Sequence, residues 1–186
     1  MPDEEVKLIE PDESYGQEYR SYVEEFRSAG EAFVVDEWDQ AGGDLAGLVR
    51  TWREHAAGRE LPKGYIPDSR YWLVRGRKIL GTGRLRHRLT PALKDYGGHI
   101  GYEVCPSERG KGNATRLLAL TLERAREMGL TRALVTCDKS NLASARVIEK
   151  NGGRLASESY SEQVGRVTRR YWIDLAPPAV STRSNE

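Results

Sequence analysis

The stretch from His99 to Gly129 constrains the fold more than any other part of the chain. It begins with a short apolar run that stops at Pro106, a residue that cannot continue a hydrogen-bonded strand. It ends with apolar residues at helical spacing, which are Ala114, Leu117, Leu118, Leu122 and Ala125. We therefore expect a strand that leads into a helix through a short loop of small residues.

The composition of that loop is typical of an anion-binding site. The first backbone N–H groups of a helix have no partner within it, and the helix dipole makes this end positive. Gly110, Gly112 and Ala114 leave room for an anion to approach the backbone. Neither the phosphate loop of NTPases nor the dinucleotide fingerprint is present. We therefore expect the backbone from Arg109 to Thr115 to bind a phosphate-bearing ligand of another kind.

The loop resembles the acetyl-CoA loop of the GCN5-related N-acetyltransferases (GNAT), whose pattern is Gln/Arg-x-x-Gly-x-Gly/Ala. Its fixed positions are filled here by Arg109, Gly112 and Ala114. Val104-x-Pro106 is similar to the fourth strand of that family, and Asn141 and the turn at 151–153 resemble its next helix and the exit from it. The combined motifs are most similar to a bacterial subgroup known only as predicted acetyltransferases.

Periodicity along the rest of the chain predicts an α/β domain. We expect strands at 6–9, 70–75, 78–88, 99–104, 132–137, 154–163 and 166–175, and helices at 14–28, 45–57, 113–128 and 142–150. The order β-α-α-β-β-β-α-β-α-β-β agrees with the resemblance, which implies a GNAT-like fold with a mixed central sheet of about seven strands and about four helices. Residues 30–43 and 90–98 are expected to be loops. A single domain is expected over 1–175, followed by a disordered tail at 176–186.

Composition narrows the class of protein. No apolar run reaches the roughly 18–20 residues of a membrane helix, and the acidic start MPDEEVKLIE is unlike a signal peptide, so we expect a cytoplasmic protein without a membrane partner. Residues 1–69 hold 17 acidic and 7 basic side chains, whereas residues 70–186 hold 11 and 22. A basic half suits nucleic acid or a phosphate-rich cofactor, and the lack of a nucleic-acid motif favours the cofactor. Cys105 and Cys137 lack zinc spacing, so we expect reduced thiols and no metal.

The resemblance implies that acetyl-CoA donates its acetyl group to an amine of a small molecule or peptide by direct attack. The cofactor-binding residues would be Val104, Arg109, Gly110, Lys111, Gly112, Asn113, Ala114, Thr115 and Asn141. The loop N–H groups would hold the pyrophosphate, with charge added by Arg109 or Lys111. The backbone of Val104 would pair with the pantetheine arm and polarise the thioester. Asn141 would bond the same arm, or would simply cap the helix that follows it.

Glu103 is the candidate general base, because it precedes Val104 on the central strand and burial would raise its pKa. Its side chain could instead point to the opposite face, toward solvent or an arginine. His87 and His99 are rivals by residue type. Many family members have a tyrosine acid seven residues after the asparagine, but this chain has Ile148 there. Possible substitutes for that acid are Tyr102, Tyr160 and Tyr171.

Several alternatives stay open at this point. Ile148 also suits a catalytically weak acyl-CoA-binding sensor module, and the basic half suits a nucleic-acid-binding protein. The expected loop at 30–43 carries Glu31, Asp36, Glu37 and Asp39 beside Phe33 and Trp38, which would suit a cationic amine or would form an exposed acidic loop. A homodimer is also possible.

Overall fold

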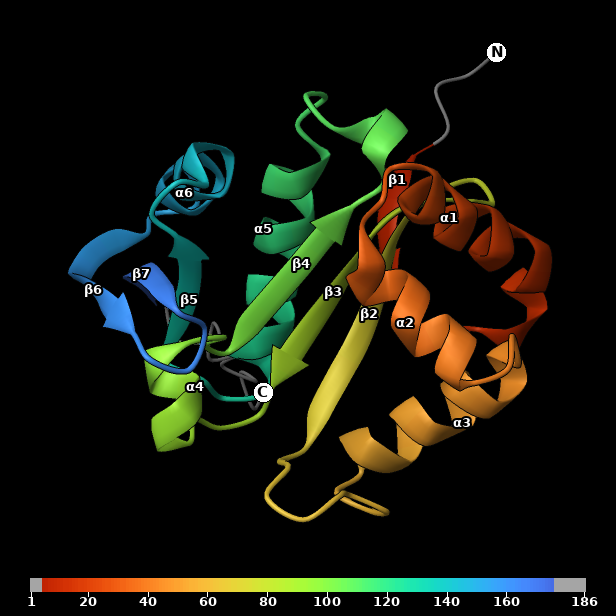
Figure 1. Ribbon diagram of the computed structural model, residues 1–186, viewed down its shortest axis with the longest axis horizontal. Coiled ribbons are helices and arrows are strands. Elements are labelled where there is room, and N and C mark those ends of the chain that lie inside the picture. The colour runs from red at the N-terminus through yellow and green to blue at the C-terminus, as the bar shows by residue number, and fades with distance from the viewer. Residues whose placement is uncertain (1–4, 176–186) are drawn as a thin grey trace, which may run out of the picture.

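A computed structural model describes residues 5–175, and the expected tail at 176–186 lies outside this range (Figure 1). Seven strands form one sheet in the order β1-β2-β3-β4-β5-β7-β6. They are β1 Val6–Ile9, β2 Asp68–Arg75, β3 Lys78–Arg86, β4 Ile100–Val104, β5 Arg132–Asp138, β6 Arg154–Ser161 and β7 Arg166–Asp174. Only β4 and β5 are parallel neighbours; the other pairs are antiparallel.

The helices lie on both faces of the sheet. They are α1 Gly16–Ser28, α2 Ala32–Gln40, α3 Leu45–Ala56, α4 Pro91–Asp95, α5 Asn113–Glu127 and α6 Leu142–Lys150, with 3-10 turns η1 Glu13–Tyr15 and η2 Pro106–Glu108. Figure 1 shows α5 crossing behind β3 and β4, while α1, α2 and α3 gather on the other face of the sheet, beside β2. The expected mixed sheet and the positions of its strands along the chain are thus confirmed.

Two segments expected to be loops contain helices, so the described residues hold six α-helices where about four were expected. Residues 30–43 contain α2, which buries Val34, Val35 and Trp38 on one side. Residues 90–98 contain α4, where the Thr90 side chain accepts a hydrogen bond from the N–H of Leu93. Both helices are short. In α2, acidic residues lie between the buried positions, so the sequence shows no clear apolar stripe.

The two parallel strands meet at one end and then diverge. Ile100 on β4 pairs with Val135 on β5, and just before it the His99 N–H donates to the Leu134 carbonyl at 2.7 Å. Gly98 permits this approach, because a Cβ there would lie 2.4 Å from the Leu134 oxygen and its φ is +59°. Beyond Ile100 the described residues of these two strands form no further pair, so the far end of β4 has an unpaired edge.

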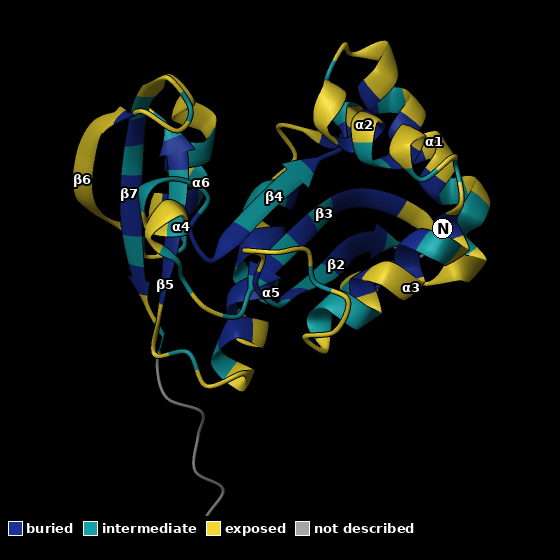
Figure 2. Cartoon of the chain, turned by 60° about the horizontal axis from the view of Figure 1, so that its bottom comes forward, coloured by how far each residue is buried: buried dark blue, intermediate teal, exposed yellow. Residues whose placement is uncertain are grey.

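Buried side chains fill both faces of the sheet (Figure 2). An aromatic cluster that includes Tyr19, Tyr22, Trp52 and Trp72 lies under α1–α3. The apolar stripe of α5 packs on the opposite face, against residues such as Leu85 and Ile100. Cys105 and Cys137 are buried and free, in agreement with the expected reduced thiols. Within residues 5–175 no helix has the length and apolar character needed to cross a bilayer.

Candidate functional site

A cavity of about 460 Å³, here called the cleft, lies beside the diverging end of β4. Its lining residues are Glu31, Tyr102, Glu103, Val104, Arg109, Gly110, Gly112, Asn113, Ala114, Asn141, Ala143 and Ser144. The structure therefore brings Glu103, Val104, Asn141 and most of the expected loop residues into one place. Of the expected site residues, Lys111 and Thr115 do not line the cleft.

Backbone donors form one wall of the cleft. Gly112 is the N-cap of α5, with a φ of 81°, and no side chain caps the helix. Among the described residues, no protein acceptor forms a hydrogen bond with the N–H groups of residues 110–115. A row of unpaired N–H groups at a helix N-terminus binds phosphate oxygens. A Cβ placed on Gly110 or Gly112 would meet no protein atom within 4 Å, so the approach to these groups is open.

The edge of β4 forms the opposite wall. The N–H of Cys105 donates to Leu80 on β3, so the neighbouring Val104 presents its N–H and carbonyl to the other edge, toward the gap. The Val104 carbonyl accepts a hydrogen bond from Nε of Arg109 at 3.0 Å. An extended chain lying in the gap could therefore pair with β4 as a further strand would.

The charged loop residues are engaged within the protein. Arg109 donates two hydrogen bonds to Glu31, and Nζ of Lys111 lies 3.4 Å from a carboxylate oxygen of Glu108. Glu108 belongs to no motif in the sequence and was not among the expected site residues. Its buried carboxylate also pairs with Lys78 at 2.7 Å, and this hydrogen bond lowers the pKa of Glu108. Because the Asn113 side chain bonds both the backbone and the carboxylate of Glu108, Glu108 anchors the loop.

A second cavity of about 300 Å³ shares Gly112 and Asn113 with the cleft. Three basic side chains line it: Arg75 from β2, Lys111 from the loop and Arg116 from α5. Positive charge at the positive end of a helix favours additional phosphate groups. Arg75 and Arg116 carry no motif and lie far apart in the sequence, which is why sequence analysis did not find them.

Asn141 has the N-cap role that was one of its two expected roles. Its Oδ1 accepts a hydrogen bond from the Ser144 N–H at 3.0 Å. The residue is exposed and lines the cleft, so its Nδ2 group is available to a ligand. Capping the helix and bonding a ligand therefore do not exclude one another.

Glu103 lies between two spaces. It lines the cleft, and it also lines a small cavity of about 10 Å³ beneath α1–α3 that is bordered by Tyr19, Trp52 and Trp72. Thr82 Oγ1 donates to Glu103 Oε2 at 3.3 Å, and Tyr22 lies 3.2 Å from the same hydroxyl. Glu103 therefore faces α1–α3, with one carboxylate oxygen held by Thr82.

Burial raises the pKa of Glu103, and this effect outweighs the opposing influence of Arg70 and the Thr82 hydrogen bond. Nearby Glu37 raises it further, whereas Arg86 lowers it. A carboxylate with a raised pKa is a better proton acceptor near neutral pH than an ordinary one. The position and the environment of Glu103 thus both suit a general base.

The two rival histidines are engaged elsewhere. His99 is buried, and its Nδ1 accepts a hydrogen bond from the Leu134 N–H at 2.9 Å. Burial lowers the pKa of His99 to about 4, so the ring is neutral at pH 7. His87 bonds Ser69 through Nε2 at 2.9 Å, and neither histidine lines the cleft.

Only one of the three candidate tyrosine acids lies in the cleft. Ile148, which stands at the family's tyrosine position, is fully buried in the core. Tyr160 is 56% exposed on the edge strand β6, and the buried Tyr171 has its hydroxyl 3.2 Å from Glu149. Tyr102 lines the cleft, and its hydroxyl lies 2.8 Å from Ser144 Oγ on α6. Burial raises the pKa of Tyr102 to about 12, so the phenol keeps its proton at neutral pH.

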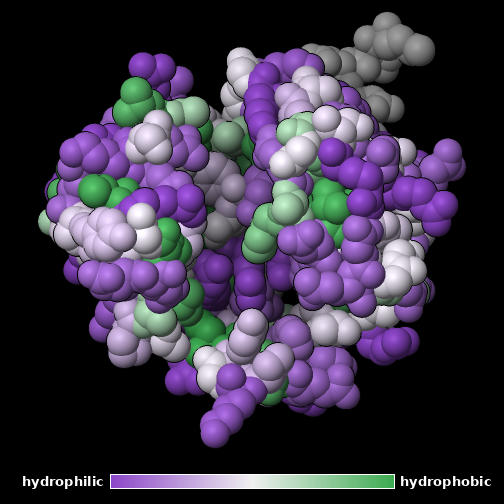
Figure 3. All heavy atoms as spheres, in the orientation of Figure 1, coloured by the Kyte–Doolittle hydropathy of each residue, from purple (hydrophilic) through white to green (hydrophobic). Residues whose placement is uncertain are grey.

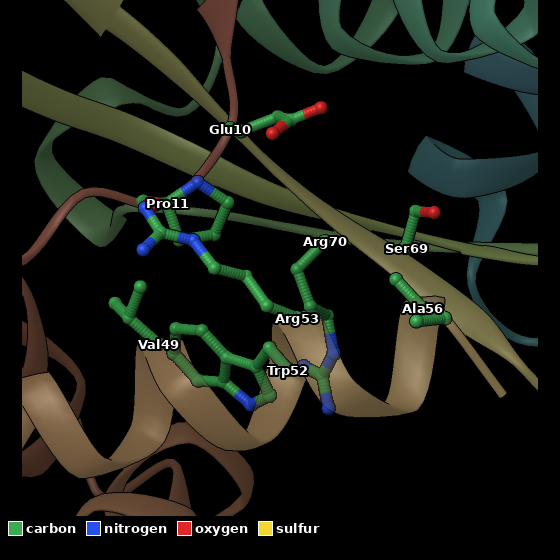
Figure 4. Close-up of a pocket in the computed structure, with 9 residues that line it drawn as sticks. Glu10, Pro11, Val49, Trp52, Arg53, Ala56, Ser69 and Arg70 are labelled. Atoms are coloured by element: carbon green, nitrogen blue, oxygen red, sulfur yellow. Dashed lines mark hydrogen bonds between the residues drawn. The ribbon is translucent and has the colours of Figure 1, made fainter. Parts of the chain in front are cut away.

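A separate cavity of about 280 Å³, the edge cavity, lies between α3 and the start of β2 (Figure 4). None of the expected site residues lines it. Figure 4 shows the guanidinium of Arg70 turned toward Trp52 and away from Ser69. Arg70 and Trp52 also border the small cavity at Glu103, so these two side chains lie between the edge cavity and that small cavity.

The acidic residues at 30–43 do not form a free acidic mouth. Glu31 binds Arg109, Glu37 binds Arg70, and Asp39 binds Arg27 through two hydrogen bonds of 3.0 and 2.7 Å. Trp38 is buried in the core, whereas Phe33 is exposed. Three of the four carboxylates are therefore already paired with arginines.

One family model and several solved structures match this chain. A family model described as an acetyltransferase (GNAT) domain matches residues 3–154. The RimL ribosomal L7/L12 alpha-N-protein acetyltransferase in complex with coenzyme A has a TM-score of 0.62 at 18% identity, over 91% of this chain and 94% of that one. The microcin C7 self-immunity acetyltransferase MccE in complex with acetyl-CoA and AMP has a TM-score of 0.64 at 15% identity, over 94% and 98%.

The ribosomal-protein-S5-alanine acetyltransferase from Vibrio fischeri gives a TM-score of 0.64 at 18% identity, over 91% of this chain and 92% of that chain. At these identities the likenesses show a shared fold. No curated protein sequence matches the chain significantly.

Proposed function

Since the chain belongs to the GNAT acetyltransferase family, we propose that it transfers an acetyl group from acetyl-CoA to an amine by direct attack. The observation that carries this proposal is the row of unpaired N–H groups at residues 110–115, beside the open edge of β4. Acetyl-CoA supplies the acetyl group as a thioester. The residues present suit it, because the cleft joins a phosphate-binding helix end to a strand edge that an extended arm could follow.

The chain's contribution to binding is mostly backbone. The N–H groups of residues 110–115 hold the pyrophosphate, and the basic cavity at Arg75, Lys111 and Arg116 takes a further phosphate. The N–H of Val104 points into the gap, where it holds and polarises the thioester carbonyl. Nδ2 of Asn141 bonds the arm from the α6 side.

Two side chains move protons. Glu103 accepts the proton of the attacking amine through its free oxygen, because Thr82 holds the other oxygen. Tyr102 donates the proton that the leaving thiolate takes up, and Ser144 fixes the direction of its hydroxyl. Tyr102 thereby replaces the side chain that Ile148 cannot supply from α6.

The test has two measurements. Calorimetry with CoA should show binding that the Gly112→Trp variant lacks, and release of free thiol from acetyl-CoA should depend on an added amine. Binding of CoA without turnover on any amine of a broad panel would indicate a CoA-binding sensor module instead. Absence of CoA binding would overturn the proposal altogether.

A further inference from the structure

We propose that the acceptor amine carries a carboxylate close to its nitrogen, and that Arg84 and Arg86 bind this carboxylate while the amine lies at Glu103. This inference rests on the function proposed above and names the substrate class of the same site. It arises from the charges on one face of β2, β3 and β4.

Strand register places three arginines on the face that carries Glu103. Thr82 lies opposite Glu103, Arg84 lies opposite Gly101 on β4, and Arg84 lies opposite Arg70 on β2. Arg86 follows Arg84 by two residues and therefore shares its face. Directly opposed residues of antiparallel strands share a face, so the arginines and Glu103 form one surface.

The guanidinium of Arg86 reaches Gly101, the residue that precedes Glu103 on this face of β4. Its Nη1 lies 3.9 Å from the point where a Cβ on Gly101 would be. Gly101 and Glu103 are successive residues on this face of β4, about 7 Å apart along the strand. That separation matches a molecule in which an amine and a carboxylate are a few bonds apart. Gly101 has no side chain to block the space.

The carboxylates near this surface leave Arg86 without an ion-pair partner among residues 5–175. Asp68 pairs with Arg84 and lies 3.4 Å from Arg70, and Glu37 bonds Arg70 at 3.0 Å. Arg86 donates to the carbonyls of Gly97 and Gly98, at 2.9 and 3.3 Å, and within residues 5–175 it has no carboxylate partner. Asp68 and Glu37 thus pair directly with Arg70 and Arg84 only, and Arg86 feels Asp68 and Glu103 without an ion pair to either.

The electrostatics of Arg86 support this conclusion. Burial and the nearby charge of Arg84 lower the pKa of Arg86 to about 10, which still leaves it charged at neutral pH. A bound carboxylate would offset both effects. A guanidinium also suits a carboxylate sterically, because its planar donors can form two parallel hydrogen bonds.

The surface is open to a ligand. Figure 3 shows a hydrophilic hollow over β3 and β4, between the side of α1–α3 and the side of α4, β6 and β7. The Arg84 side chain is 22% exposed and Arg86 is half-buried. In contrast, Glu31, Glu37 and Asp39, three of the four acidic residues at 30–43 that would attract a purely cationic amine, are paired with arginines.

The experiment compares matched acceptors at fixed, saturating acetyl-CoA. The pairs are phenylalanine with phenethylamine, leucine with isoamylamine, and lysine with cadaverine, together with short peptides that differ only by Asp or Asn after the first residue. We expect a higher kcat/KM for the member with the carboxylate in at least one pair. Equal or higher kcat/KM for every amine without the carboxylate overturns the inference and leaves the acetyltransferase proposal standing.

Variants then locate the carboxylate. Arg86→Met should raise KM for the preferred carboxylate acceptor by roughly 10- to 100-fold, the usual effect of losing a charge-assisted hydrogen bond. The KM for acetyl-CoA should stay within about twofold, and kcat/KM should fall more for the carboxylate acceptor than for its decarboxylated partner, whose rate changes only through the effect of Arg86 on the pKa of Glu103. Arg86→Lys should restore part of the loss. Arg124→Met, on α5 behind the sheet, is the matched control. An Arg86→Met variant with an unchanged acceptor KM removes Arg86 from the site.

Two outcomes separate this inference from the function on which it rests. If the wild-type protein does not bind CoA, or acetylates none of the acceptors, both the inference and the proposed function are contradicted. If Arg86→Met fails to fold, as circular dichroism would show, the matched pairs measured with the wild-type protein still decide the question.

Discussion

Arg109 donates two hydrogen bonds to Glu31, of 2.7 and 2.8 Å, across 78 residues of sequence. The pair ties the loop before α5 to the residue that precedes α2, and both residues line the cleft. The charge of Arg109 is therefore compensated, whereas the sequence pattern suggests a free cation for phosphate. Hydrogen bonding to Arg109 also lowers the pKa of Glu31, which keeps the carboxylate ionised.

The first prediction follows from this pair. Glu31→Gln removes a negative charge from the cleft and frees Arg109, so CoA should bind about 3- to 10-fold more tightly at low salt, with a smaller gain at high salt. Calorimetry at two salt concentrations measures this. Asp39→Asn breaks a similar pair with Arg27 that does not line the cleft, and it should leave affinity unchanged. Weaker CoA binding in Glu31→Gln would show that the pair serves to position the loop.

Gly112→Trp should abolish CoA binding. A side chain at this position meets no protein atom and would occupy the space in front of the N–H groups. The positive φ of 81° adds a backbone cost of about 1–2 kcal/mol, so the melting temperature should fall by a few degrees. Gly129→Trp is the matched control, because Gly129 has a φ of 88° and open space at the other end of α5. Equal CoA affinity in the two variants would exclude the phosphate site.

Glu103→Gln should lower kcat by about 10²- to 10⁴-fold while CoA affinity holds, because the amide cannot accept a proton. The acidic limb of the pH–rate profile should disappear, since the raised pKa of Glu103 sets where activity falls as the pH is lowered. Glu123→Gln, exposed on α5, serves as the control. A variant with normal turnover and the same acidic limb would remove Glu103 from the mechanism.

The same substitution has a consequence for stability. Because the pKa of Glu103 is raised on folding, ionising it favours the unfolded chain, and its cost to stability grows as the pH rises from about 4.5 through the folded pKa. Glu103→Gln should therefore be at least as stable as wild type at pH 8. Thermal unfolding at pH 4 and pH 8 tests the sign.

Tyr102→Phe should lower kcat by on the order of 100-fold with little change in CoA affinity, because it removes the proposed proton donor and keeps the ring. Ser144→Ala should have a smaller effect, since it removes only the group that directs the hydroxyl. Tyr160→Phe, on the exposed edge strand, is the control. Rapid-quench measurement of acetyl transfer distinguishes slow chemistry from slow product release. A full-speed Tyr102→Phe enzyme would leave thiolate protonation to water.

Glu108→Gln should lower the free energy of unfolding by about 1–3 kcal/mol and weaken CoA binding, because Lys78 and the loop lose their shared buried partner. The pKa of Glu108 is lowered, so its contribution is present above the ordinary value of 4.5 and is lost as the pH falls through the folded pKa. The difference from wild type in urea denaturation should thus shrink in acid. Glu127→Gln, which breaks an exposed pair with Arg124, should cost less than about 1 kcal/mol.

The sequence by itself determined the elements with strong local signals. The strand, glycine loop and helix around residues 99–129 were predictable because backbone freedom at Gly110 and Gly112 and the apolar spacing of α5 are local properties. The positions of the seven strands along the chain followed from similar patterns and from the family resemblance, whereas their order in the sheet came only from the structure. The short helices α2 and α4 were missed, since a helix of this length is stabilised mainly by packing and capping.

Only the tertiary structure decided which side chains meet. The pairing of Arg109 with Glu31, the anchoring of the loop by Glu108 and the placing of Arg86 near Gly101 join residues on different elements. Sequence patterns could not choose among Tyr102, Tyr160 and Tyr171, because each is an aromatic residue on a strand. Burial, register and the position of α6 distinguish them, and these depend on how the sheet folds in space.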